Sequence, residues 1–272
     1  MRYLDGNDFK EQNGYVVRDN WYPRVTRILE IKSKPGLESF FREVGSFESA
    51  EEVKTKSAAH GSLVHETVQK LAVGEKIAIP EKIRAATEAF LEFNKERPIH
   101  FHPEFIERQV WSEFHRYAGT VDALASIDGK FGVLDIKTST GMYPEYNLQT
   151  AAYVQALQEN SVKEAMSLPH NIETRWILRI DQYQVCRACS AKLREKGGWV
   201  KVRLSRKKSN GKGKYSGLIP CPDGEHDWAD MEGEVELREF PYYYNDMKAF
   251  NAAKTLWEWE NSYWLRQIGY SR

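Results

Sequence analysis

The sequence has no long hydrophobic run, and this argues against a membrane protein with spanning helices. No stretch approaches the ~20 consecutive apolar residues of a membrane-spanning helix. The first residues, Met-Arg-Tyr-Leu-Asp-Gly-Asn-Asp, also lack the apolar segment of a secretory signal peptide. We therefore expect a cytoplasmic (intracellular) protein, in a cell or in the cytosol of a host, with no membrane partner.

An excess of charge of one sign is also missing, because 39 Lys and Arg balance 39 Asp and Glu. The balance is uneven along the chain. Residues 181–226 contain eleven Lys or Arg and four Asp or Glu, so the remainder carries an equal excess of acid. A local basic segment of this kind attracts an anionic polymer. Within it, we expect Arg206, Lys207 and Lys208 to contact the anionic groups of such a polymer.

Cysteine is scarce, and all three cysteines fall in this basic segment. Cys186 and Cys189 form a Cys-x-x-Cys pair, and Cys221 is followed by His226. Three thiols and an imidazole are the four ligands of a closed tetrahedral zinc site. Three unrelated thiols or a redox pair are the alternatives, although the βαβ pattern that usually accompanies a redox pair is absent.

The most informative stretch is residues 119–138, Gly-Thr-Val-Asp-Ala-Leu-Ala-Ser-Ile-Asp-Gly-Lys-Phe-Gly-Val-Leu-Asp-Ile-Lys-Thr. Two runs rich in β-branched and apolar residues flank Asp128-Gly129, a strong signal for a tight β-hairpin. A two-residue loop at this position sets Asp122 opposite Asp135. A three-residue loop would shift the pairing by one residue and turn one aspartate away.

Two carboxylates in opposed positions repel each other, so a fold gains from them only if something offsets this repulsion. Directly opposed side chains have Cβ atoms about 4.5–5.5 Å apart, where like charges destabilise a sheet. A cation between Asp122 and Asp135 removes this cost. Lys137 falls on the same face as Asp135, because side chains alternate along a strand. Two carboxylates and a lysine on one face indicate a phosphodiesterase site for a hard cation.

Two helices are expected to carry further candidates. Gly61-Ser-Leu-Val-His-Glu begins a helix with Ser62 as N-cap and His65 in its first turn, although a lone histidine is more often structural. On a helix from about 145 to 159, Gln149 and Tyr153 share one face. They suit a phosphate or a base edge, and a buried hydrogen-bonded tyrosine is an equal alternative.

The remaining segments are expected to complete a sheet covered by helices. Residues 105–114 alternate as a strand, on which Glu107 is a further metal-ligand candidate or simply a solvated side chain. Residues 174–180 predict another strand, whose regularity ends at Asp181. Residues 81–96 and 246–264 predict amphipathic helices, the second with a tryptophan-rich stripe that is more often core than a base-stacking surface. The chain shows no internal repeat.

Taken together, these motifs resemble the PD-(D/E)XK nuclease superfamily. The motifs are His65 in Gly-Ser-Leu-Val-His-Glu, Asp122 in Ala-Gly-Thr-Val-Asp, Asp135-Ile-Lys137-Thr and Gln149-x3-Tyr153. Their order is similar to the RecB-like branch, which includes the mitochondrial genome maintenance exonuclease and CRISPR-associated RecB-like nucleases. Residues 22–29, Tyr-Pro-Arg-Val-Thr-Arg-Ile-Leu, resemble the opening strand of that branch.

The resemblance implies a ligand set and a mechanism. Asp122, Asp135 and the Ile136 carbonyl would hold Mg²⁺ or Mn²⁺, with His65 completing the shell. Lys137 would orient the attacking water and offset developing negative charge. Gln149 and Tyr153 would complete the catalytic set by positioning the strand. The family's proline is replaced by Val121, which removes no ligand. No cysteine precedes Cys186, so the iron–sulfur cluster of some relatives is disfavoured.

We therefore predict an α/β (α+β) protein with a central mixed sheet flanked by helices. Residues 1–180 would form the nuclease core, 181–226 a zinc-ribbon-like insertion, and 227–272 a helix completing the core. The expected function is metal-dependent exonucleolytic cleavage of single-stranded DNA or duplex ends, with a recombination or replication protein as a further partner. A catalytically silent nucleic-acid-binding module and a zinc-organised interaction protein are the alternatives.

Overall fold

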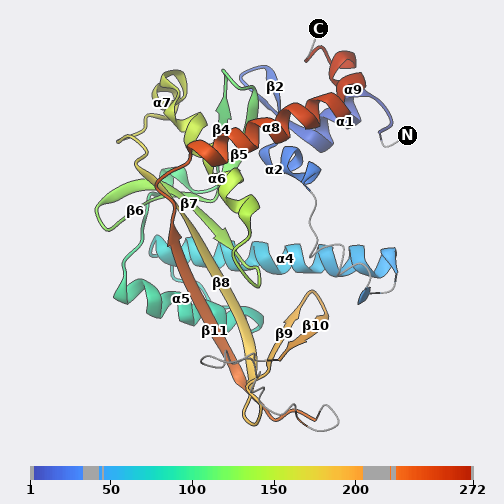
Figure 1. The fold of residues 1–272 in the computed structure, drawn as a ribbon. Coiled ribbons are helices and arrows are strands. Elements are labelled where there is room, and N and C mark those ends of the chain that lie inside the picture. Colours follow the sequence, from blue (N-terminus) through green and yellow to red (C-terminus); the bar gives the residue numbers. More distant parts are fainter. Residues whose placement is uncertain (1–2, 33–42, 45, 205–220, 222–224, 271–272) are drawn as a thin grey trace, which may run out of the picture.

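A computed structural model describes residues 3–32, 43–44, 46–204, 221 and 225–270. Its centre is a mixed α/β arrangement, in which one sheet has helices on both faces (Figure 1). The strand order is β10-β9-β8-β7-β6-β3, and β11 also pairs with β8. The strands of this sheet are β3 (His100–Phe101), β6 (Ala123–Ile127), β7 (Lys130–Lys137), β8 (Thr174–Cys186), β9 (Lys192–Lys196), β10 (Trp199–Arg203) and β11 (Trp228–Glu239).

The helices and smaller strands surround this sheet. Strands β1 and β2 form one two-stranded sheet, and β4 and β5 form another. These elements are α1 (Gly6–Asn13), β1 (Gly14–Val17), β2 (Asn20–Pro23), α2 (Val25–Ile28), α4 (Phe47–Ala72), α5 (Arg84–Glu96), β4 (Arg108–Ser112), β5 (Tyr117–Val121), α6 (Pro144–Gln158), α7 (Asn160–Met166), α8 (Tyr244–Glu260) and α9 (Ser262–Gln267).

Alternation along β6 and β7 divides the hydrophobic core into two parts. Leu124 and Val133 pack into a cluster with residues of α6 and α8 on one face. Leu134 and Ile136 pack with residues of α4 and α5 on the other face. Because successive side chains of a strand point to opposite faces, one hairpin contributes side chains to both clusters. The sheet is therefore buried on both sides where it carries the predicted site.

The hairpin has the two-residue loop that the sequence predicts. Ile127 pairs with Lys130, and the antiparallel ladder continues to Ala123 and Leu134. Asp128 and Gly129 have φ angles of 52° and 78°. Positive φ at both central residues defines the type I′ turn that favours Asp-Gly. The side chains of β7 therefore point as the sequence predicts.

Four element boundaries differ from the sequence predictions. Helix α4 begins at Phe47, with Ser46 as its N-cap, so Ser62 lies inside the helix. A hydroxyl before a helical stretch is only a local signal, and the preceding polar residues continue the helix. The strand predicted over 105–114 is shorter, because Phe105 ends a 3₁₀ turn and β4 runs from Arg108 to Ser112. Strand β8 continues beyond Asp181, because β11 pairs with it along its length. The prediction of 227–272 as a helix was wrong for its first part, since Trp228–Glu239 is strand β11.

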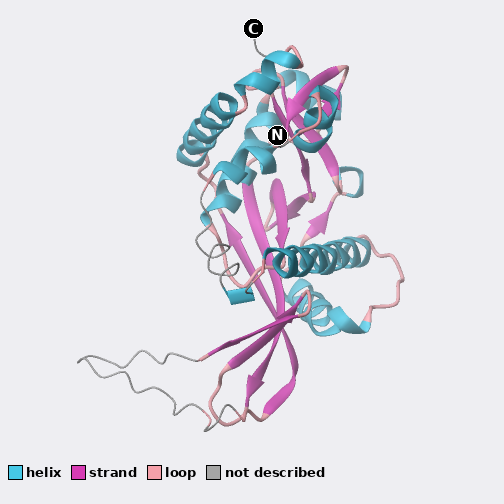
Figure 2. Ribbon diagram, turned by 90° about the vertical axis from the view of Figure 1, so that its right-hand side faces the viewer, coloured by secondary structure: helices cyan, strands magenta, loops and turns pink. Residues whose placement is uncertain are grey.

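The predicted C-terminal helix is present and belongs to the core. Trp257 stacks on Phe9 of α1 with ring centroids 6.2 Å apart, and Phe250 is fully buried. The tryptophan stripe therefore packs the N-terminal elements against α8, as its spacing favoured. Figure 2 shows the helical part at one end of the molecule and the extended strands at the other. Among the described residues, no helix combines the length and apolar character that a membrane crossing requires.

Candidate functional site

Asp122 occupies the bend between β5 and β6, next to the last paired residue of the hairpin. Its Oδ2 accepts a hydrogen bond of 2.6 Å from the backbone N–H of Ile136. The N–H and C=O of a strand residue point to the same side, so the Ile136 carbonyl also faces the edge at which Asp122 lies. The ladder ends at the Ala123–Leu134 pair, so the predicted pairing of Asp122 opposite Asp135 was wrong. The bend instead turns the Asp122 carboxylate to the Ile136 amide of β7.

Asp135 and Lys137 form a buried ion pair on β7. Lys137 Nζ lies 2.8 Å from Oδ1 and 2.7 Å from Oδ2 of Asp135. The Asp135 side chain is 1% exposed and that of Lys137 is 18% exposed. Tyr146 of α6 lies beside the amine, with its ring centroid 5.1 Å from Nζ. The alternation that placed both side chains on one face therefore brings them into direct contact.

A second group of polar atoms gathers around Asp122. His65, Glu107 and Asp122 each offer one ligand atom, and these atoms lie within 4.8 Å of one another. His65 Nδ1 is 3.6 Å from Asp122 Oδ2. The group combines two carboxylates and an imidazole from separate elements, and its oxygen-rich donor set suits Mg²⁺ or Mn²⁺.

Glu107 is held in this group by its backbone and by Gln69. It precedes β4 with a φ of 48°, and its N–H donates to the Asp122 carbonyl at 3.1 Å. Gln69 Nε2 donates to Glu107 Oε1 at 2.8 Å and to the Asp122 carbonyl at 2.9 Å. Glu107 is exposed, yet these bonds direct its carboxylate to Asp122. One amide therefore fixes two members of the group.

Burial shapes the protonation of these residues. Loss of solvation raises the pKa of both Asp122 and Asp135 to about 6, although the Lys137 charge opposes the shift. Burial, and then repulsion from Lys137, lowers the pKa of His65 to about 4. Burial alone would lower the pKa of Lys137, but Asp135 and Asp122 raise it above its ordinary value. One buried and one half-buried carboxylate beside a neutral imidazole fit a divalent cation, because a cation offsets the cost of ionising them.

Gln149 and Tyr153 lie together on α6, as their spacing predicts. Gln149 Nε2 donates to the Tyr153 hydroxyl at 3.1 Å. Tyr153 is 2% exposed, and burial followed by the charge of Asp135 raises its pKa well above the ordinary value. Tyr153 therefore packs behind Asp135, and the role of the Gln149–Tyr153 pair in positioning a strand stays a prediction.

Cys186, Cys189, Cys221 and His226 lie together, with one ligand atom from each within 4.8 Å of the others. Cys186 Sγ is 3.6 Å from Cys221 Sγ, and Cys189 Sγ is 3.3 Å from His226 Nδ1. The Ser190 N–H donates to the Cys186 carbonyl at 2.9 Å, which closes the turn around the first two thiols. Three sulfur atoms and one imidazole nitrogen fit a structural zinc ion.

The predicted DNA contacts Arg206, Lys207 and Lys208 lie outside the described residues. Two other residues at the site were not singled out from the sequence. Gln69 follows His65 by four positions, and this spacing places both on one helix face. Tyr146 precedes Gln149 by three positions on α6. Helical spacing relative to a known candidate is the signal that would have found both.

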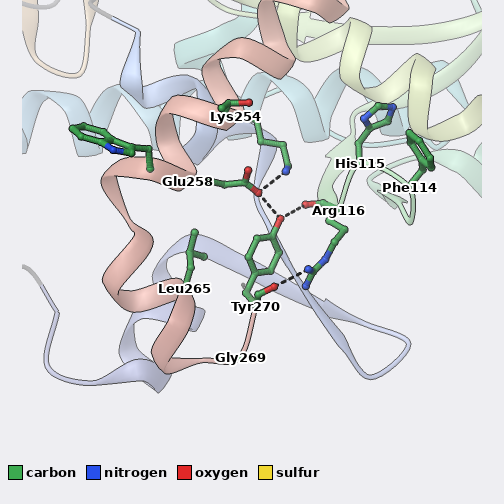
Figure 3. A pocket seen from close by; sticks show the side chains of 10 residues that line it. Phe114, His115, Arg116, Lys254, Glu258, Leu265, Gly269 and Tyr270 are labelled. Carbon is green, nitrogen blue, oxygen red and sulfur yellow. Dashed lines mark hydrogen bonds and ion pairs between the residues drawn. The ribbon is translucent and has the colours of Figure 1, made fainter. Parts of the chain in front are cut away.

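A cavity of about 740 Å³ lies elsewhere, between α8, α9 and the turn that joins β4 and β5 (Figure 3). None of the predicted site residues lines it. Its polar groups are engaged with one another. Arg116 donates to the Tyr270 carbonyl at 2.7 Å, and the Tyr270 hydroxyl donates to Glu258 at 2.8 Å. The cavity and the carboxylate group are therefore separate features.

Two comparisons with known proteins bear on this geometry. A search of curated proteins found no match. The family model of the PD-(D/E)XK nuclease superfamily matches residues 36–179. The matched range contains the hairpin, the His65 helix and α6, and it covers slightly more than half of the chain. The chain therefore belongs to the PD-(D/E)XK nuclease superfamily.

Proposed function

We propose that this protein is a Mg²⁺- or Mn²⁺-dependent deoxyribonuclease. The observation that carries the proposal is that a group of candidate metal ligands lies next to a buried ion pair of β7. His65, Glu107 and Asp122 present converging ligand atoms, and the Asp135–Lys137 ion pair lies on the strand whose Ile136 amide binds Asp122. A cation site beside a buried ammonium group suits phosphodiester hydrolysis, in which negative charge develops at the phosphoryl group.

Each residue has a role in this proposal. Asp122, Glu107 and His65, with the Ile136 carbonyl and Asp135, would hold the ion. The bound ion would polarise a phosphoryl oxygen and lower the pKa of a water molecule. Lys137 would orient that water and offset the developing charge. Its contact with Asp135, 2.7 Å long, keeps the amine charged and directed.

We further propose that the enzyme is an exonuclease that acts on single strands or duplex ends in DNA recombination, repair or replication. The support is the order of four motifs, which resembles the RecB-like branch. The test compares a linear single strand with a closed circle of the same sequence, each with Mg²⁺ or Mn²⁺. An exonuclease degrades only the linear strand. Cleavage of the circle at an equal rate would contradict this mode of action.

The intact set of Asp122, Asp135 and Lys137 argues against a catalytically silent nucleic-acid-binding module. A cleavage assay separates the two functions. Binding of DNA without any metal-dependent cleavage would favour the silent module. The same assay with RNA tests the choice of DNA as substrate.

We also propose that Cys186, Cys189, Cys221 and His226 hold a structural Zn²⁺ ion. The site joins the end of β8 to the start of β11, because Cys186 ends β8 and His226 precedes Trp228 by two residues. The His226 and Trp228 rings are 4.6 Å apart, so the site is packed on the sheet. Zinc there would fix the end of the sheet from which β9 and β10 extend.

A further inference from the structure

The hairpin formed by β9 and β10 has one strongly cationic face. Its register pairs Lys192 with Arg203, Arg194 with Lys201, and Lys196 with Trp199. Directly opposed residues of a hairpin share a face. Five cations and one tryptophan therefore point to one side, whereas Leu193, Glu195, Val200 and Val202 point to the other.

This cationic face lies against the loop that follows the catalytic strand. Lys196 Nζ donates to the Thr138 carbonyl at 2.5 Å and to its Oγ1 at 2.6 Å. Arg194 donates to the same carbonyl at 2.7 Å. Thr138 directly follows Lys137, and Arg203 approaches the hydroxyl of Thr140 at 3.5 Å. The hairpin is thus joined to the end of β7.

The tip of the hairpin is also fixed on α4. Gly197 has a φ of +63°, and a Cβ at this position would lie 2.4 Å from the Val53 carbonyl oxygen and 2.3 Å from Ser57 Oγ. Only a glycine allows so close an approach. Figure 1 shows β9 and β10 rising from the far end of the sheet toward α4. The hairpin is held at both its tip and its side.

Four of the five cations form two pairs that differ in what they contact. Arg194 and Lys196 are the inner pair, with Arg194 bound to Asp181 at 2.7 Å and Lys196 bound to Thr138. Lys201 and Arg203 are the outer pair. The Lys201 side chain is 43% exposed and its ion pair with Glu43 is 3.0 Å long, while Arg203 is exposed. Exposed ion pairs contribute little to stability, so these cations are available to another anion.

We propose that Lys201 and Arg203 bind the sugar–phosphate backbone of the nucleic acid strand that enters the site at Asp135 and Lys137. This proposal rests on the proposed nuclease function and names the surface that holds the substrate. Arg194 and Lys196 are positioning residues, because they fix the hairpin to Thr138. The outer cations would then track phosphates next to the one that is cleaved.

The test measures binding separately from cleavage. In the Asp135→Asn background with Mn²⁺, a fluorescent single-stranded DNA is titrated at several salt concentrations. Each phosphate contact on a single strand contributes about 0.7 to the slope of log K against log salt concentration. We expect the slope to fall by about 1.4 in the double variant Lys201→Ala/Arg203→Ala, since two contacts are lost.

A matched control is Lys95→Ala. Lys95 is an exposed lysine on α5 that pairs with Glu92 at 2.9 Å, as Lys201 pairs with Glu43. It should leave the slope unchanged. A double variant that is folded by circular dichroism and keeps the original slope, or a Lys95→Ala variant with an equal decrease, would overturn the hairpin proposal. Cleavage by the wild-type protein is measured separately, and its absence would instead overturn the nuclease function.

Discussion

Lys137 and Asp135 are in direct contact, with Nζ 2.7 Å from Oδ2, while His65, Glu107 and Asp122 form a separate group of converging ligand atoms. The two arrangements meet at Ile136, whose N–H donates to Asp122. Under the proposed function, this division gives neighbouring residues different roles. The amine would act at the reacting phosphate, and the imidazole would bind the ion.

The first prediction separates catalysis from metal affinity. Lys137→Met should lower the single-turnover cleavage rate by at least about a hundredfold, because a charged group at the transition state is removed. Calorimetric titration should show nearly unchanged Mn²⁺ affinity. His65→Ala should do the reverse, with weaker Mn²⁺ binding and partial rescue by excess Mn²⁺. An equal loss of affinity and rate in Lys137→Met would show that the amine supports the ion.

The second prediction concerns pH. Asp122 and Asp135 have a pKa of about 6 in the folded, metal-free protein and an ordinary value of 3.8. Between these values the folded state binds more protons than the unfolded state. The free energy of unfolding should therefore fall as pH rises through this window, by up to about 3 kcal/mol for each carboxylate.

Denaturant titrations of the metal-free protein across this window measure the effect. Asp122→Asn should make the dependence shallower, because one of the two groups is removed. Apparent Mn²⁺ affinity should rise with pH over the same range, since the ion displaces the protons. Two results together would contradict the raised pKa values of Asp122 and Asp135. The free energy of unfolding of the wild type would rise with pH, and Asp122→Asn would leave this dependence unchanged.

The third prediction tests the support for Glu107. Gln69→Leu removes the donor that binds both Glu107 and the Asp122 carbonyl. Loss of such a supporting hydrogen bond typically lowers metal affinity by about 10–100-fold. The matched control is Gln158→Leu, which removes an amide donor to the Ile172 carbonyl, 2.9 Å away. If both variants bind Mn²⁺ as the wild type does, Glu107 is not a ligand.

The fourth prediction concerns zinc. Protein purified without added metal should contain one equivalent of zinc, and Cys189→Ser should lower that content. Removal of zinc should loosen the end of the sheet around Cys186 while the core stays folded, because metal binding and folding are coupled where the ligands lie. Hydrogen exchange locates the change. Zinc far below one equivalent, with all three thiols freely titratable, would exclude the site.

The hairpin was predictable because its signals are local. Asp128-Gly129 favours one turn type, and that turn fixes the register of every residue to Ala123 and Leu134. The bend at Asp122 was not predictable in the same way. The carboxylate leaves the ladder to accept the Ile136 amide, a choice that depends on the packing of β5 and β6.

Contacts between segments far apart in the sequence could not be predicted from sequence patterns. Gln69 and Glu107 are 38 positions apart, and no periodicity links them. The β9–β10 hairpin was read only as part of a basic stretch, because its docking depends on Thr138 and on the backbone of α4. The start of α4 was misplaced because a hydroxyl side chain inside a helix resembles an N-cap.

The measurement that tests the central claim most directly is metal-dependent cleavage of a linear single-stranded DNA by the wild-type protein and by Asp135→Asn. Asp246→Asn is the control, because Asp246 is also paired with a buried cation, Arg175, outside the site. We expect cleavage with Mg²⁺ or Mn²⁺ by the wild type and the control, and at least about a hundredfold less by Asp135→Asn. Cleavage by Asp135→Asn at the wild-type rate would contradict the assigned site.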